Sequence, residues 1–325
     1  MKILITGAGG YVGCELAKEL LNQNHNITAL DLFLYGDSVL TKNENLKIVR
    51  GDIRNQELLK KEFKNQDIII HLACISNDPS FELNPVLGKS INLDAFEPLV
   101  KIAKDVGVKR FIYASSSSVY GVKKEMNVHE DMQLEPLTDY SKYKALCEDI
   151  LLKYTSNNFV TTILRPATVC GFSMRQRLDL VVNILTSLAY YKKEIVIFGG
   201  EQLRPNIHIK DMIRAYITVI NASSDIINGN IFNVGFQNLK VKHIAENIRK
   251  ILGDNIKIIK KESDDDRSYH ISSEKFKSEL LFKNQHTVEE AVRDLCNAFD
   301  SGILQDPLNN IKYYNIKLMN SINLK

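Results

Sequence analysis

Short apolar runs alternate with amphipathic stretches along the first half of the chain. The apolar runs predict strands at residues 3–6, 27–31, 46–51, 67–73, 110–115 and 160–165. Between them, apolar positions at helical spacing predict helices over residues 11–22, 55–63, 92–106 and 140–154. Strands that alternate with such helices form βαβ units, so we expect an α/β fold with a doubly wound parallel sheet.

The pattern is less regular after Pro166. Strands are predicted at residues 195–198 and 230–234, and helices at 178–190, 208–221, 241–252 and 288–299. The tail, residues 307–325, shows no clear period. We therefore expect a first domain over residues 1–170 and a smaller C-terminal lobe over 171–325, with residues 230–252 returning to the first domain.

The composition is that of an ordinary globular protein. The 325 residues are 44% hydrophobic and 25% charged, and the formal net charge is +3. This balance gives no electrostatic footprint for nucleic acid or for an anionic membrane. Apolar runs such as residues 68–75 fall well short of the roughly 20 residues that span a bilayer. The chain begins directly with a strand pattern rather than a secretory segment, so we expect a cytoplasmic protein without nucleic-acid or membrane partners.

Cysteine and histidine positions do not support a disulfide framework or a metal site. The five cysteines are scattered and include no C-x-x-C pair, which is typical of reduced thiols. His208 has no companions at metal-ligand spacing, and we predict no bound metal. His71, in an apolar run, and Cys170 are expected to be structural rather than catalytic.

A glycine-rich turn separates the first strand from the first helix. Gly7, Gly10 and Gly13 allow a tight turn and a close approach of the backbone, which lets a diphosphate reach the start of the helix. Asp31 ends the second strand, where a carboxylate accepts hydrogen bonds from ribose hydroxyls and repels a 2′-phosphate. The pair favours a Rossmann-type site for NAD rather than NADP, against the alternatives of a structural turn and a turn-forming aspartate.

A second constellation consists of Tyr140, Lys144 and the serines that follow the strand at 110–115. Tyr140 and Lys144 are four residues apart and share a helix face. A lysine ammonium beside a phenol lowers the pKa of the phenol toward neutral pH. A serine hydroxyl at the strand end is placed to bind the same substrate oxygen. These groups suit proton removal from an alcohol while a nicotinamide takes its hydride, although a Tyr-x-x-x-Lys spacing alone is common.

Taken together, these motifs resemble the extended short-chain dehydrogenases/reductases, specifically the NAD-dependent nucleotide-sugar epimerase/dehydratase family. The resemblance spans residues 1–282 and does not cover the tail. Besides the residues already named, its matching segments are 52–54, 71–73, Asn92, 165–169 and 204–211.

The resemblance implies a role for each matching residue. Those implied for NAD are Gly7, Gly10, Tyr11, Val12 and Gly13 at the diphosphate, Asp31 and Leu32 at the adenosine ribose, Asp52 and Ile53 at the adenine, Leu72, Ala73 and Asn92 along the cofactor, and Pro166, Thr168 and Val169 at the carboxamide. The implied catalytic residues are Ser116, Tyr140 and Lys144, of which Tyr140 and Lys144 also contact the cofactor.

For the nucleotide-sugar substrate, the implied residues are Ser116, Ser117, Asn183, Arg204 and Arg267. The alternative interpretation of each arginine is a solvated surface charge. The alternative interpretation of Asn183 is a helix cap. Arg175 and Arg177 either help at this site or form a plain basic loop.

One departure from the family pattern bears on the reaction. The sugar 4,6-dehydratases carry an Asp-Glu pair after the catalytic residue, where this chain has Ser117 and Ser118. Hydroxyls do not readily remove a carbon-bound proton, so dehydration is disfavoured. The resemblance then implies oxidation at C4 of an NDP-hexose or NDP-heptose by a 4-epimerase or a 4-dehydrogenase, with surface-polysaccharide synthesis as the setting.

Three other functions are alternatives to a 4-epimerase or a 4-dehydrogenase. A 4-ketoreductase would run the same chemistry backwards. A non-catalytic dinucleotide-binding module is the alternative of another class, although such modules usually lose the tyrosine or the lysine. A steroid- or flavonoid-type reductase would carry a basic, NADP-selecting residue near position 31 and no diphosphate-binding arginines, whereas this chain has Asp31 and Arg204.

The resemblance also implies a homodimer. In the family, the helix that carries Tyr140 and the helix after Asn92 form a four-helix bundle with their copies. Phe96, Val100, Leu146 and Ile150 are the apolar residues expected to supply that surface, and burial in the subunit's own core is the alternative.

Overall fold

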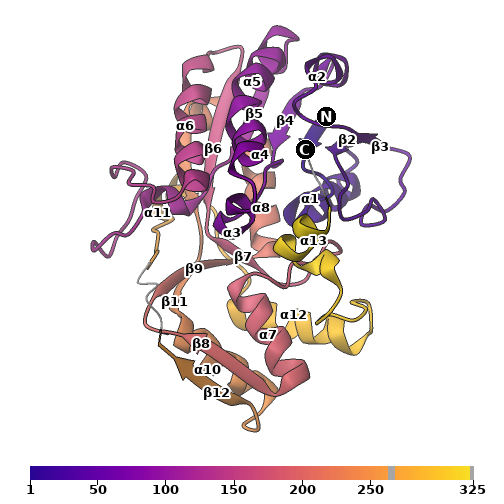
Figure 1. The fold of residues 1–325 in the computed structure, drawn as a ribbon. Coiled ribbons are helices and arrows are strands. Elements are labelled where there is room, and N and C mark those ends of the chain that lie inside the picture. Colours follow the sequence, from indigo (N-terminus) through magenta and orange to yellow (C-terminus); the bar gives the residue numbers. More distant parts are fainter. Residues whose placement is uncertain (263–267, 323–325) are drawn as a thin grey trace.

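The computed structural model describes residues 1–262 and 268–322, and its centre is a seven-stranded sheet (Figure 1). All neighbouring strands in this sheet are parallel. Their order is β10 (Asn230–Val234), β6 (Val160–Pro166), β5 (Arg110–Ala114), β4 (Ile68–His71), β1 (Lys2–Thr6), β2 (Asn26–Asp31) and β3 (Leu46–Arg50). The predicted α/β fold with a doubly wound parallel sheet is confirmed.

Helices cover both faces of this sheet, each over its own apolar core. One face is covered by α1 (Tyr11–Asn22) and α8 (Ile209–Asn221), which bury Leu20 and Tyr216. The other face is covered by α2 (Gln56–Phe63), α5 (Phe96–Asp105) and α6 (Asp139–Tyr154). The strands between them are buried on both sides, which explains the continuous apolar run that becomes β4.

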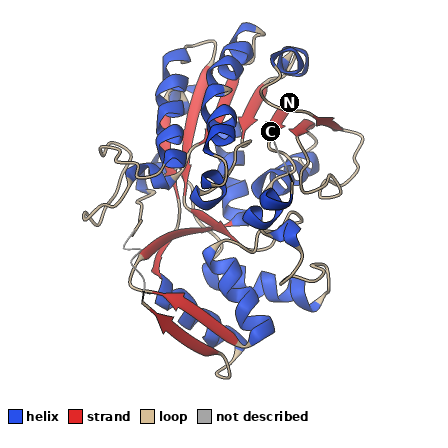
Figure 2. Ribbon diagram, in the orientation of Figure 1, coloured by secondary structure: helices blue, strands red, loops and turns tan. Residues whose placement is uncertain are grey.

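A second lobe lies below the sheet in Figure 2. Its core is formed where α7 (Val181–Lys192), α10 (Val241–Leu252) and α12 (Val288–Asp300) pack together. Two small sheets complete it: β11 (Gln237–Lys240), β9 (Leu203–His208) and β7 (Thr168–Cys170) form the first, and β12 (Lys257–Lys261) and β8 (Glu194–Phe198) form the second.

The chain passes between the lobes at positions that differ from the expected ones. Both α8 and β10 belong to the first lobe, because α8 packs beside α1 and β10 pairs with β6. By contrast, α10 packs against α7 and α12 in the second lobe. The return to the first lobe therefore covers residues 209–234 instead of 230–252.

Short elements fill the remaining connections. Between β4 and α5 the chain forms α3 (Asp78–Glu82), α4 (Pro85–Lys89) and the π-helical turn η1 (Ser90–Asp94), so the helix expected from residue 92 starts as a π turn. The others are η2 (Ser117–Tyr120), α9 (Ser224–Ile227), α11 (Glu274–Glu279), η3 (Ile311–Tyr313) and α13 (Asn315–Ser321). The last two lie in the tail, where the sequence shows no period.

Two further expectations concern membrane spans and the dimer surface. Among the described residues, no helix is both long and apolar enough to cross a bilayer. Phe96 and Val100, expected on a dimer surface, are 1% and 0% exposed within the subunit, so that expectation is wrong for them. Their side chains face the sheet, whereas Leu146 is exposed and Ile150 is half-buried.

Candidate active site

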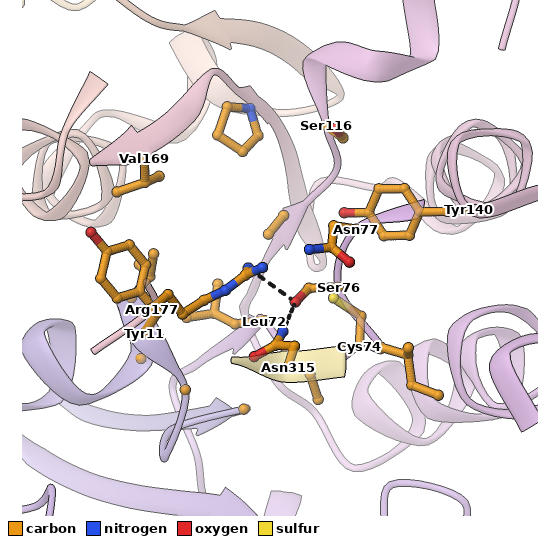
Figure 3. A pocket seen from close by; sticks show the side chains of 18 of the residues that line it. Tyr11, Leu72, Cys74, Ser76, Asn77, Ser116, Tyr140, Val169, Arg177 and Asn315 are labelled. Atoms are coloured by element: carbon orange, nitrogen blue, oxygen red, sulfur yellow. Dashed lines mark hydrogen bonds between the residues drawn. The ribbon is translucent and has the colours of Figure 1, made fainter. Parts of the chain in front are cut away.

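A cavity of about 460 Å³ opens at the carboxyl ends of the parallel strands. This is the crevice in which doubly wound folds bind their ligands. Most of the predicted site residues line it, namely Gly7, Gly10, Tyr11, Val12, Gly13, Asp31, Leu32, Asp52, Ile53, Leu72, Ala73, Ser116, Ser117, Tyr140, Lys144, Pro166, Thr168, Val169 and Arg204. Figure 3 shows part of this lining, with Tyr11 and Tyr140 on opposite sides.

Two of the described predicted residues do not line the cavity. Asn92 is buried, and its amide exchanges two hydrogen bonds of 2.9 Å with the backbone of Ile75. Asn183 is fully buried: its Oδ1 accepts from the Gly171 N–H, and its Nδ2 donates to the Tyr11 hydroxyl. Both side chains hold backbone segments that border the cavity. Arg267 lies outside the described residues.

The backbone of the glycine turn packs so closely against its neighbours that a side chain would not fit at Gly7. Gly7 has a φ of 76°, and a Cβ at this position would lie 2.6 Å from the backbone nitrogen of Ala73. The turn is closed by a 3.0 Å hydrogen bond from the Gly10 N–H to the Gly7 carbonyl. No side chain caps the start of α1. A helix start of this kind is a site for a phosphate group.

Asp31 lies beside this turn and is fixed by it. Its Oδ2 accepts from the Gly9 N–H at 3.0 Å and its Oδ1 from the Phe33 N–H at 2.7 Å. Burial raises the pKa of this carboxyl group, and the two backbone donors oppose the rise. A carboxylate has about four lone-pair positions, so both oxygens retain capacity for ribose hydroxyls. The turn and the carboxylate therefore fit the diphosphate and ribose of NAD.

The helix α6 presents Tyr140 and Lys144 to the other side of the cavity. Thr138 caps α6 in a reciprocal capping box with Ser141, which fixes the first turn and with it Tyr140. The Lys144 Nζ donates a 2.6 Å hydrogen bond to the Ala114 carbonyl and lies 5.8 Å from the centre of the Tyr140 ring. Figure 3 shows the Tyr140 hydroxyl directed into the cavity.

Burial dominates the protonation of Tyr140. It raises the pKa of the phenol well above its usual value, and Cys74 and Asp78 raise it further. Arg177 opposes the rise. The pKa of the phenol is therefore not brought toward neutral pH in the described structure, contrary to the expectation from Lys144, because burial raises it. The Lys144 ammonium is held by the Ala114 carbonyl of β5. Burial of the phenol has the larger effect on its pKa.

Ser116 follows β5 and caps the short helix η2. Its Oγ accepts a 3.1 Å hydrogen bond from the Ser118 N–H and lies 2.8 Å from the Ser118 Oγ. Ser117 and Ser118 also line the cavity. No carboxylate stands at either position, so the side chains of these three residues offer only hydroxyl groups to the cavity.

The second lobe contributes Arg204 from β9. Its guanidinium lies 5.5 Å from the centre of the Tyr269 ring, and both residues line the cavity. A guanidinium at this place suits a bidentate contact with a phosphate. It stands in the part of the cavity that the second lobe contributes.

Sequence reasoning missed several lining residues, above all those of the loop after β4 and of the tail. They include Tyr35, Cys74, Ser76, Asn77, Asn315 and Met319. Arg175 and Arg177, for which the sequence left two interpretations, line the cavity as buried side chains and are not a solvated basic loop. No local spacing marks these residues, because they come together only through the tertiary fold.

The parallel sheet, the glycine turn and Asp31 define a dinucleotide-binding α/β protein. The family model of the NAD dependent epimerase/dehydratase family matches residues 3–235. The chain belongs to this family, whose cofactor is NAD.

Individual relatives agree with this membership. The chain is 32% identical over 266 residues to an uncharacterized UDP-glucose epimerase, YtcB, of Bacillus subtilis, covering 76% of this chain and 82% of that one. It is 26% identical to a UDP-glucose 4-epimerase of Lactobacillus helveticus, with 78% and 82% covered. The UDP-glucose 4-epimerase of Thermotoga maritima, solved with UDP-glucose, has the same fold, with a TM-score of 0.85, 22% identity, and 93% of this chain and 100% of that one covered.

Proposed function

We propose that the protein oxidises C4 of a nucleotide-linked hexose or heptose, as an NAD-dependent 4-epimerase or 4-dehydrogenase. One observation carries the proposal: the Tyr140 hydroxyl and Ser116 face the same cavity as the glycine turn and Asp31. The names of the relatives, UDP-glucose 4-epimerases among them, point to the same carbon.

The cofactor's place follows from the turn and the carboxylate. The start of α1 would hold the diphosphate, and Asp31 the adenosine ribose. When bound, NAD supplies a positively charged ring that accepts a hydride. Leu72, Ala73 and the segment after β6 would border that ring, since they line the same cavity as Gly7 and Tyr140.

Tyr140 would exchange the proton of the C4 hydroxyl. The ionised phenol would take this proton as the hydride leaves C4, and the protonated phenol would return the same proton when the ketone is reduced. Burial raises the pKa of the phenol and so opposes the ionised form. Positive charge near the phenol favours its ionised form when it must accept a proton, and Lys144 contributes such a charge. Ser116 would donate a hydrogen bond to the same substrate oxygen.

Substrate binding would come from the second lobe, in keeping with a division into a dinucleotide-binding and a sugar-nucleotide-binding part. Arg204 of this lobe would contact the diphosphate of the substrate, and Ser117 of the first lobe would contact its sugar. Since no acid follows Ser116, elimination of water is disfavoured. The 4-keto sugar would then either regain the hydride on its other face or leave the enzyme.

The proposal is tested with the purified full-length protein and a panel of NDP-hexoses and NDP-heptoses, UDP-glucose and UDP-galactose included. NMR follows the configuration at C4, and absorbance at 340 nm reports NADH. Conversion without NADH release identifies an epimerase, and NADH release with a 4-keto product identifies a dehydrogenase.

Tyr140→Phe is expected to lower kcat roughly 10²- to 10⁴-fold, because it removes the proton-transferring hydroxyl. Tyr143→Phe is the matched control, since Tyr143 lies on the same helix and packs against Phe81 outside the cavity lining. Unchanged turnover in Tyr140→Phe would refute the assigned mechanism.

We further propose a cytoplasmic homodimer. The five free cysteines, three of them buried, suit a reducing compartment. The outer side of α6 with Leu146 and Ile150 is the part of the expected bundle surface that is not fully buried in the subunit.

A further inference from the structure

The C-terminal helix α13 reaches the cavity although it lies outside the family match at residues 3–235. Asn315 and Met319 of this helix line the same cavity as the glycine turn. Asn315 is only 4% exposed. Figure 1 shows α13 in yellow at the level where the two lobes meet.

Asn315 uses its backbone N–H and both polar atoms of its side chain to join distant segments. Its backbone N–H donates to the Asp179 carboxylate at 3.1 Å, and its Nδ2 donates to the Ser76 Oγ at 3.0 Å. Its Oδ1 accepts from the Tyr35 hydroxyl at 3.0 Å and from the Arg175 Nη2 at 2.5 Å. One amide thus links the tail to the loops after β2, β4 and β7.

Arg175 is the unusual partner in this set. Its side chain is buried and stacks on Tyr35, with the guanidinium carbon 3.5 Å from the ring centre. Its Nε and Nη1 have no hydrogen-bond partner among the described residues. A buried cation with two unpaired donors is costly unless an anion satisfies it. The guanidinium lines the cavity, which is where such an anion would lie.

The position of the Arg175 loop indicates which anion this is. The loop packs on the first two turns of α1: the Ser173 Oγ donates to the Tyr11 carbonyl at 2.8 Å, and the Met174 N–H donates to the Glu15 carboxylate. Arg175 is also close enough to the Asp31 carboxyl to lower its pKa. Arg175 thus lines the same cavity as the start of α1 and Asp31, and its loop is held against α1; the start of this helix is where a dinucleotide diphosphate binds in this fold.

Arg177 extends the arrangement toward Tyr140. It forms an ion pair with Asp179, with Nε 2.9 Å from Oδ1, and its Nη1 donates to the Ser76 Oγ at 3.2 Å. Ser76 is thus shared between Arg177 and Asn315, and Figure 3 shows the three side chains meeting inside the cavity. The tail and the loop hold each other in place at this point.

We propose that α13 is a structural part of the cofactor site: Arg175 binds the diphosphate of the dinucleotide, and Asn315 positions Arg175 for that contact. This inference rests on the proposed NAD site.

The test compares two probes on the full-length protein by isothermal titration calorimetry. ADP-ribose carries the diphosphate, and adenosine lacks it. In Arg175→Gln and Asn315→Ala, the affinity for ADP-ribose is expected to fall roughly ten- to a hundredfold, while that for adenosine stays within about twofold. Arg175→Lys, which keeps the charge, is expected to retain part of the affinity. Asn320→Ala, on the exposed side of the same helix, is the matched control and is expected to change neither affinity.

A double variant separates positioning from general support of the fold. If Asn315 acts through Arg175, the combined variant loses little more ADP-ribose affinity than Arg175→Gln alone. Unchanged ADP-ribose affinity in the single variants, or an equal loss for adenosine, overturns the proposal.

These outcomes are distinct from failure of the proposed function. A wild-type protein that binds ADP-ribose through Arg175 but converts no nucleotide sugar would refute the C4 reaction and leave this site standing. Active enzyme with unchanged variants would refute the site alone. Absence of ADP-ribose binding in the wild type would refute both.

Discussion

Tyr140 places a phenol where its surroundings oppose ionisation. The sequence locates this residue and its helix neighbour Lys144, but helical spacing says nothing about atoms that other elements contribute. The Ala114 carbonyl holds the ammonium, and burial raises the pKa of the phenol. The residue types of the site are thus predictable from local spacing, whereas the protonation of the phenol depends on tertiary contacts.

His71 is expected to give the fold an acid-sensitive component. Its ring is buried among Phe96, Phe111 and Tyr113, with Nδ1 2.8 Å from the Thr6 Oγ1. Burial lowers the pKa of this imidazole to about 3, from an unfolded value near 6.5. The unfolded chain therefore binds the proton first, so the free energy of unfolding falls as the pH drops from about 6.5 toward 3.

Urea denaturation between pH 7 and pH 4 measures this dependence. His71→Asn is expected to be less stable at pH 7, because it leaves a smaller side chain in the core, but to show a shallower loss of stability toward pH 4. The same slope in the variant and the wild type would contradict the assignment to His71.

Other residues of the site show where prediction from sequence ends. Gly7 and Asp31 are recognisable because the chemistry and the strand–turn–helix context lie within one βαβ unit. Ser76, Arg175 and Asn315 are far apart in the chain and meet only through the fold. A single sequence carries no local pattern for such a meeting.

At the scale of elements, α6 is anchored to β6 by a buried ion pair. The Arg165 guanidinium donates to the Glu148 carboxylate, with Nη2 2.6 Å from Oε2, and both side chains are at most 3% exposed. Arg165 also donates from Nη1 to the Tyr120 hydroxyl at 2.7 Å. Glu148 lies one turn beyond Lys144 on α6, so this pair helps to set the register of the helix against the sheet.

Glu148→Gln is expected to cost about 3–5 kcal/mol of unfolding free energy, because it leaves the Arg165 charge buried without its partner. Asp149→Asn is the control, since the neighbouring carboxylate is exposed. Chemical denaturation of both variants measures the difference. A loss below about 1 kcal/mol in Glu148→Gln would mean that the pair does not anchor the helix.

Three of the elements that the sequence missed each have a physical reason of their own. The strand β9 contains Pro205, which has no N–H to donate to a neighbouring strand, so the sequence does not favour a strand there. The strand β12 is short and partly exposed, with three lysines in Lys257–Lys261, so no apolar run marks it. The short helix α13 buries only Asn315 and Leu318, too few positions for a visible period.

At the scale of the whole molecule, each lobe is built from discontinuous stretches of chain. The first lobe is completed by α8 and β10, both of which follow the first strands of the second lobe. The tail returns once more and contacts the region of α3 through α13. The cavity between the lobes is therefore lined from both ends of the chain.

Because each lobe is built from discontinuous stretches of chain, the N-terminal and C-terminal halves of the sequence are not independent folding units. A fragment ending at residue 170 would leave β6 without β10, exposing the hydrogen-bonding edge of a strand whose Ile163 and Leu164 are fully buried. Such an edge invites self-association, so the fragment is expected to be insoluble when expressed alone. The control is a fragment of residues 1–235, which retains α8 and β10 and should give more soluble protein. Centrifugation of the lysates, followed by comparison of the soluble and pelleted fractions, measures the difference. Recombination between relatives should then succeed at surface loops within one lobe and fail at the apparent midpoint of the sequence.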